Sequence, residues 1–129
     1  MIFFILVYLC LIKTNSFNLY MVDKRIFPEY KPLSKNQDIY KKALEEKSKN
    51  IILATGSAGT GKTLFATCVG IDKLNKKYYE KIIITRPLLK NSKEINPLVK
   101  HIFDILYEHY DYLDIEKKLR DNIIETIPL

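Results

Sequence analysis

The sequence predicts an α/β fold, in which helices cover a mainly parallel β-sheet, and three observations lead to this prediction. Two short apolar runs rich in β-branched residues, Asn50–Thr55 and Lys81–Thr85, have the composition of buried strands. A glycine-rich segment follows the first run, and residues 61–76 then have helical character. The order strand, loop, helix, strand predicts a right-handed crossover between two parallel strands.

Composition limits the classes of protein that are possible. The chain has 129 residues, of which 47% are hydrophobic and 28% charged, so it is globular rather than disordered. Its net charge of +6 attracts polyanions, although short lysine clusters are also typical of solvated helix faces. Only two cysteines occur, Cys10 and Cys68, and this argues against a structural zinc site. Cys68 is expected to pack in the core.

Residues 1–20 differ from the rest, because Ile2–Ile12 is an unbroken apolar run. The run is shorter than the roughly 20 residues that span a bilayer, and it lacks the flanking signals of a secreted protein. Three interpretations remain open: an extension or misassigned start, a signal or anchor, and a buried strand. Residues 21–129 are expected to be the working domain. The expected location is cytoplasmic, or secreted or membrane-anchored if residues 1–12 act as a signal.

Helices are expected before and after the strands. Residues 27–33 form an extended lead-in, and Ser34 opens a helix because Ser34 and Gln37 have the spacing of a capping box. The apolar stripe of that helix is Ile39, Ala43 and Leu44. The helix after the glycine-rich segment is expected to point four residues inward: Leu64, Phe65, Val69 and Leu74.

The last third of the chain predicts two more helices and a strand. Pro97 is expected to open a helix, because proline is tolerated in a first turn. Its apolar residues at helical spacing are Val99, Ile102, Phe103, Leu106 and Tyr110. A further helix is expected over residues 114–121, and a last strand over residues 123–127.

The glycine-rich segment carries the chemistry. Gly56–Thr63 matches G-x-x-x-x-G-K-[ST] at every fixed position. Backbone N–H groups can surround a triphosphate only if the chain curls tightly, and the residues expected to do so are Gly56, Ser57, Ala58, Gly59, Thr60 and Gly61. Lys62 adds a positive charge for the β- and γ-phosphates, and Thr63 offers a hydroxyl for Mg²⁺. The sequence therefore predicts a loop that binds a nucleoside triphosphate.

The segments KPLSKNQDIYKKAL, SAGTGKT and IIITRPL resemble the first part of PhoH-like proteins, from about Phe27 to Leu106. That family is similar to the ATPase core of superfamily 1 helicases. The resemblance implies a P-loop NTPase-type three-layer sandwich, of which this chain holds the N-terminal portion. It implies ATP and Mg²⁺ as cofactors, Lys62 as the catalytic residue, ATP hydrolysis in the complete domain, and a role in RNA metabolism.

Two further positions follow from the resemblance. Gln37 matches a glutamine that reads the adenine edge in related ATPases, but it fits the capping-box position equally well. Thr85 and Arg86 match a strand end that faces nucleic acid or phosphate, although an arginine there is often a solvated charge. Single-stranded RNA and a second copy of the chain are therefore considered as partners besides the nucleotide.

The chain departs from the family in two places. Glycine-rich and acidic elements that usually follow the Thr-Arg-Pro motif are missing, and no apolar run ends in the acidic pair that holds Mg²⁺ for hydrolysis. Three functions remain open. The first is an ATPase completed by further sequence or by a partner chain. The second is a module or remnant that binds ATP without hydrolysing it. The third, with the least support, is a small-molecule kinase.

Overall fold

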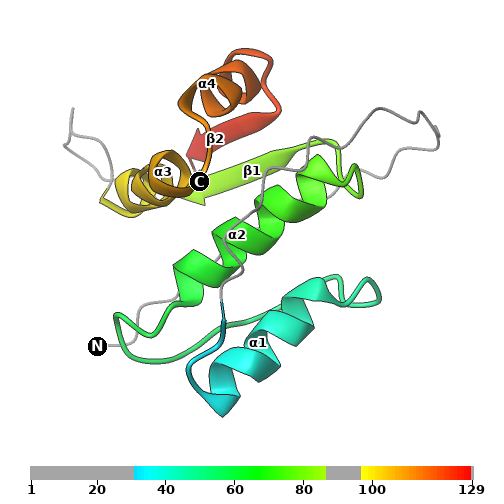
Figure 1. The fold of residues 1–129 in the computed structure, drawn as a ribbon, viewed down its shortest axis with the longest axis vertical. Coiled ribbons are helices and arrows are strands. Elements are labelled where there is room, and N and C mark those ends of the chain that lie inside the picture. Colours follow the sequence, from blue (N-terminus) through cyan, green and yellow to red (C-terminus); the bar gives the residue numbers. More distant parts are fainter. Residues whose placement is uncertain (1–30, 87–96, 129) are drawn as a thin grey trace.

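The computed structural model describes residues 31–86 and 97–128, which form an α/β arrangement (Figure 1). Along the chain its elements are α1 (Lys35–Glu45), α2 (Lys62–Asn75), β1 (Ile82–Arg86), α3 (Pro97–His109), α4 (Tyr112–Arg120) and β2 (Ile124–Pro128). The predictions made for residues 1–20 and for the segment after the Thr-Arg-Pro motif, 87–96, lie outside the described residues. None of the described helices has the length and apolar character that crossing a membrane requires.

The sheet of the described residues pairs β1 with β2 in parallel, from Ile82 opposite Ile124 to Arg86 opposite Pro128. The connection between the two strands runs through α3 and α4. A parallel pair is what the sequence predicts, but its members differ from the prediction. The partner of β1 is the last strand of the chain and not the segment 50–55.

The prediction of a buried strand over Asn50–Thr55 is wrong. No strand is assigned there, and the side chains of Ile51 and Leu53 are 76% and 74% exposed. Ile52, between them, is partly buried and packs against the apolar side chains at the contact between α1 and α2. A β-branched apolar run favours extended backbone, but a strand also needs a neighbour to pair with. Within the described residues β1 pairs with β2 instead.

The predicted helix at Ser34 is confirmed as α1, whose first turn is capped by the Ser34 hydroxyl accepting from the Gln37 N–H at 3.2 Å. Leu44 is buried as expected, whereas Ile39 is 55% exposed and does not belong to the inward face. Tyr40 takes its place against the core. In α2, Phe65, Val69 and Leu74 are buried as predicted and Leu64 is only half-buried.

The later helices also agree with the sequence. Pro97 is the first residue of α3. α4 begins at Tyr112, two positions before the expected start, because the Asp111 carboxylate caps it by accepting from the N–H groups of Leu113 and Asp114. Cys68 is buried, as expected.

The core lies in two clusters. The larger one joins α2, the sheet, α3 and α4, and its most deeply buried members are Ile71, Leu106, Ile115 and Ile124. The smaller one joins α1 to α2 through Leu44, Phe65, Ala66 and Val69. Helix α1 therefore packs on α2, while α2 and α3 both contact β1 (Figure 1). The position of α2 between α1 and the sheet fixes the loop that precedes it.

Candidate functional site

The segment Gly56–Thr63 forms a tight loop that leads into α2. Gly59 and Gly61 have φ angles of 75° and 88°, in the left-handed region that favours glycine. At Gly61 a side chain would also be crowded, since a Cβ atom there would lie 3.2 Å from the Phe65 ring and 3.4 Å from the Gln37 amide nitrogen. The second glycine of the motif is thus required both by its backbone angle and by its neighbours.

The Lys62 ammonium holds the loop together by hydrogen bonds to its oxygen atoms. Its Nζ donates to the carbonyl oxygens of Gly56, at 3.1 Å, and Ser57, and to the Thr60 hydroxyl at 3.0 Å. The Thr60 hydroxyl in turn donates to the Ser57 carbonyl at 2.9 Å. The loop oxygens therefore surround a positive charge supplied by the chain itself, on a flexible stem that can carry it elsewhere.

The first turn of α2 is suited to an anion. Gly61 is its N-cap and makes no side-chain cap hydrogen bond, and the turn contains no acidic residue. The N–H groups at a helix N-terminus that lack such a cap, together with the positive end of the helix dipole, favour phosphate. Thr63 lies in this turn and is 7% exposed. The groups present therefore fit the phosphates of a nucleotide.

Gln37 contacts this loop. Its Oε1 accepts from the Leu33 N–H at 2.7 Å, and its Nε2 donates to the Thr60 carbonyl at 3.1 Å. Only half of a capping box is present, because Ser34 caps Gln37 while the Gln37 side chain turns to the loop. The amide keeps one N–H and one lone pair for a further partner. Whether it reads a base stays a prediction.

Tyr40 is a site residue that the sequence interpretation missed. Its hydroxyl donates to the Lys62 carbonyl at 3.1 Å, and its ring packs edge-on against Phe65. Burial raises the pKa of Tyr40 to about 12. A signal was available, because Tyr40 follows Gln37 by three positions and such residues share one face of a helix.

Thr85 and Arg86 are the last residues of β1, opposite Ile127 and Pro128. They lie at the carboxyl end of the strand, as expected. In Figure 1 α2 begins at the end toward which the arrows of β1 and β2 point. The hydrogen bonds described above join Gln37, Tyr40 and the loop, and the contact proposed for Thr85 and Arg86 stays a prediction.

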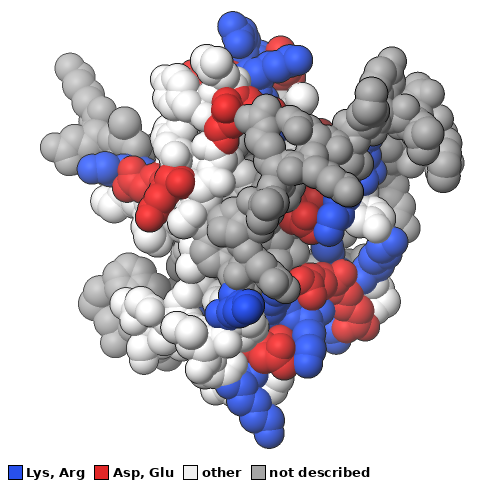
Figure 2. All heavy atoms as spheres, viewed as in Figure 1, with Lys and Arg blue, Asp and Glu red and all other residues white. Residues whose placement is uncertain are grey.

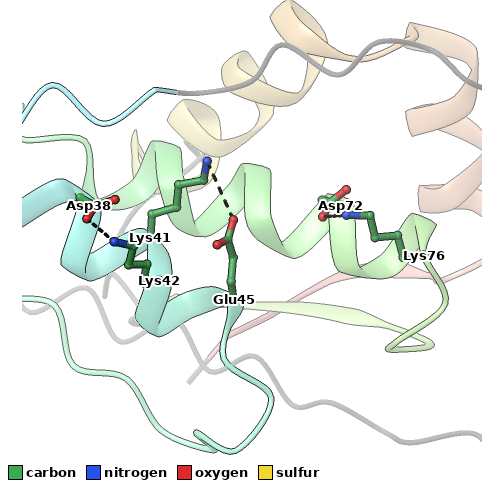
Figure 3. Close-up of polar contacts among 6 residues, drawn as sticks. All are labelled: Asp38, Lys41, Lys42, Glu45, Asp72 and Lys76. Atoms are coloured by element: carbon green, nitrogen blue, oxygen red, sulfur yellow. Dashed lines mark hydrogen bonds and ion pairs between the residues drawn. The ribbon is translucent and has the colours of Figure 1, made fainter.

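The lysine clusters Lys41-Lys42, within α1, and Lys76-Lys77, directly after α2, stand beside acidic residues. Lys42 pairs with Asp38 at 2.7 Å, Lys41 with Glu45 at 3.9 Å and Lys76 with Asp72 at 2.8 Å (Figure 3). On this face of the molecule basic and acidic side chains alternate (Figure 2). These pairs follow the helical i, i+4 spacing. The side chains of Lys42 and Lys76 are 72% and 56% exposed, which supports their interpretation as solvated residues, whereas that of Lys41 is only 23% exposed.

Within residues 31–86 and 97–128, no group of three or more His, Cys, Asp and Glu side chains is arranged to hold a metal ion. Asp104 lies within α3, and Asp114 and Glu116 lie within α4. These three carboxylates therefore lie in helices and not at the end of a strand, where a hydrolytic Mg²⁺ ligand is expected.

Comparison with known proteins gives a consistent result. The family model described as PhoH-like protein matches residues 29–129. A PhoH-like protein of Mycobacterium tuberculosis (strain H37Rv) is 31% identical over 110 residues, which cover 77% of this chain and 31% of the relative. The protein PhoH of Escherichia coli (strain K12) is 33% identical over 102 residues, with coverages of 69% and 28%.

The PhoH-like protein of Bacillus subtilis (strain 168) is 27% identical over 94 residues, covering 64% of this chain and 30% of the relative. The chain thus spans about a third of the length of the curated relatives that it matches. No solved structure matches it significantly.

Proposed function

This chain belongs to the PhoH-like protein family, and from that premise we propose that the loop Gly56–Thr63 binds the phosphates of ATP. The observation that carries the proposal is the position of the Lys62 ammonium, which donates hydrogen bonds to three oxygen atoms of the loop. Lys62 is also the first residue of α2, whose N-terminus has no side-chain cap. An arriving triphosphate offers that ammonium stronger acceptors than neutral carbonyls, and it offers anionic oxygens to the helix N–H groups.

Mg²⁺ would accompany the nucleotide, and Thr63 is the residue proposed to contact it. The hydroxyl of a residue in this position can ligate the ion, which supplies charge neutralisation of the phosphates. Thr63 is 7% exposed, so this contact is proposed to form as the loop opens around the nucleotide.

Hydrolysis of ATP is proposed for the completed family domain. A carboxylate at a strand end is required to hold Mg²⁺ and to orient water. The chain covers about a third of its curated relatives, so that carboxylate is proposed to come from further polypeptide or from a partner chain, on a sheet that grows into the three-layer sandwich. The alternative is a module that binds ATP without turnover, and a small-molecule kinase is the third candidate.

The test is the affinity of the purified chain for Mg-ATP beside that of two variants. Lys62→Ala is expected to weaken binding by about tenfold or more, because a charge-assisted contact is lost. The matched control is Lys76→Ala, which removes a lysine that follows the C-terminal end of α2 and pairs with Asp72. Equal affinity in all three proteins would reject the proposal.

Phosphate release measured in the same proteins separates the alternatives. Turnover that Lys62→Ala abolishes would exclude the module without hydrolysis, and phosphorylation of an added nucleoside would favour the kinase. We also propose a role with RNA, on the basis of the resemblance to helicase-like ATPases and the position of Arg86 at a strand end. It predicts salt-sensitive binding of single-stranded RNA that weakens in Arg86→Ala, and binding indifferent to both changes would reject it.

A further inference from the structure

Two side chains from one face of α1 hold the backbone on either side of Gly61. The Gln37 amide donates to the Thr60 carbonyl and the Tyr40 hydroxyl donates to the Lys62 carbonyl, each at 3.1 Å. Both residues point the same way because they are three positions apart in the helix. The two acceptors flank the one loop residue whose left-handed backbone leads directly into α2.

Helix α1 is itself anchored, so these two donors have a fixed origin. Leu44 packs in the small core cluster with Phe65, and the Leu44 carbonyl accepts from the Lys73 ammonium at 2.6 Å. At the other end of α1, the Gln37 Oε1 accepts from the Leu33 N–H. Both ends of α1 are therefore tied, the C-terminal end to α2 and the N-terminal end to the lead-in.

The first half of the loop is held differently. The carbonyls of Gly56 and Ser57 are bonded by the Lys62 ammonium, the group that nucleotide binding draws away toward the phosphates. The hydrogen bonds from Gln37 and Tyr40 are accepted by carbonyl oxygens, and a phosphate, which is itself an acceptor, does not compete for them as a partner. Those two bonds can therefore persist when the nucleotide enters, while the bonds from Lys62 cannot.

On the basis of the ATP binding proposed above, we infer that Tyr40 and Gln37 are positioning residues. They fix Thr60–Lys62 in the conformation that presents the N–H groups of α2 to phosphate, and the Gly56–Ala58 half reshapes around the ligand. Preorganisation of this kind raises affinity by reducing the ordering that binding would otherwise require. Because the contacts are to backbone, the effect is independent of the base of the nucleotide.

The experiment compares Tyr40→Phe and Gln37→Ala with the unsubstituted chain in two measurements. The first is hydrogen exchange of the amides of residues 57–63 without nucleotide, which is expected to be faster in both variants. The second is affinity for Mg-ATP and Mg-GTP, which is expected to fall about 2- to 10-fold, by the same factor for both nucleotides. Tyr107→Phe is the matched control, since it removes a tyrosine hydroxyl bonded to Glu116.

Each result decides one point. Loop exchange that is unchanged in Tyr40→Phe would overturn the positioning role, whatever the affinities are. A loss in Gln37→Ala confined to ATP would overturn it for Gln37 and indicate that this amide reads adenine. If the unsubstituted chain binds neither nucleotide, the proposed function fails, while the exchange measurement still decides whether α1 holds the loop. Thermal melting of each variant shows that it is folded.

Discussion

The Nζ atom of Lys73 lies 2.6 Å from the backbone carbonyl oxygen of Leu44 and ties the end of α1 to α2. Lys73 is 8% exposed, and the Tyr79 ring lies 5.5 Å from its ammonium. Burial lowers the pKa of Lys73 below its ordinary value, and the charge of Glu45 opposes this shift only in part. Because the pKa of this buried lysine is lowered on folding, the free energy of unfolding should depend on pH in the alkaline range.

The change Lys73→Met should remove this dependence. A lysine whose pKa is lowered on folding adds stability at high pH, and the contribution is lost as the pH falls through the folded-state pKa. The free energy of unfolding of the unsubstituted chain should therefore rise relative to that of Lys73→Met as the pH rises through the folded-state pKa toward the ordinary lysine value of 10.5. Denaturant unfolding at several pH values measures the difference, and a difference constant with pH would contradict the prediction.

Gly61→Ala and Gly59→Ala separate backbone strain from crowding. Both replace a glycine of positive φ, which costs about 1 kcal/mol or more. Only the change at Gly61 also drives a methyl group toward the Phe65 ring, whereas nothing lies within 4 Å at Gly59. Gly61→Ala should be the more destabilising by about 1–3 kcal/mol in denaturant unfolding. Equal losses would show that the ring moves freely aside.

The phenol of Tyr107 should titrate abnormally. Its hydroxyl donates to the Glu116 carboxylate at 2.6 Å, and this bond, with smaller contributions from burial and charge, raises the pKa of Tyr107 to about 12. Glu116→Gln should return that pKa toward 10, because the charged acceptor is removed. Site-resolved NMR titration measures it. Tyr40 is the internal control, since its raised pKa comes from burial and should not respond.

Ile115 and Leu113 lie on the same helix with opposite surroundings, at 0% and 74% exposure. Ile115→Ala should lower the free energy of unfolding by about 2–5 kcal/mol, because it empties space at the centre of the larger core cluster. Leu113→Ala should change it by no more than about 0.5 kcal/mol. A small loss at Ile115 would mean that the neighbouring residues close the cavity.

The helices could be predicted because their signals are local. Ser34 caps α1, Pro97 opens α3, and apolar spacing identifies the buried faces of α2 and α3. Whether Asn50–Thr55 is a strand could not be predicted in this way, since pairing depends on what lies beside the segment. Its apolar pattern indicated extended backbone, and the partner of β1 was instead supplied from the far end of the chain.

The candidate site likewise has one part that the local sequence predicts and one part that it does not. The loop was visible in the sequence because each motif position follows from phosphate chemistry. The contacts of Gln37 and Tyr40 depend on the packing of α1 against α2, which joins residues more than twenty positions apart. Local spacing showed only that these two side chains share a face. What that face meets is a property of the tertiary structure.

The exposed side chains of Ile51 and Leu53 bear on how the chain behaves in solution. Exposed apolar side chains that no strand of the described residues covers favour self-association. The net charge of +6 opposes this by keeping copies apart at low ionic strength. Salt screens that repulsion within about 10 Å at 0.1 M. Colloidal stability should therefore decline as salt is added, and this sets the buffers in which nucleotide affinity can be measured.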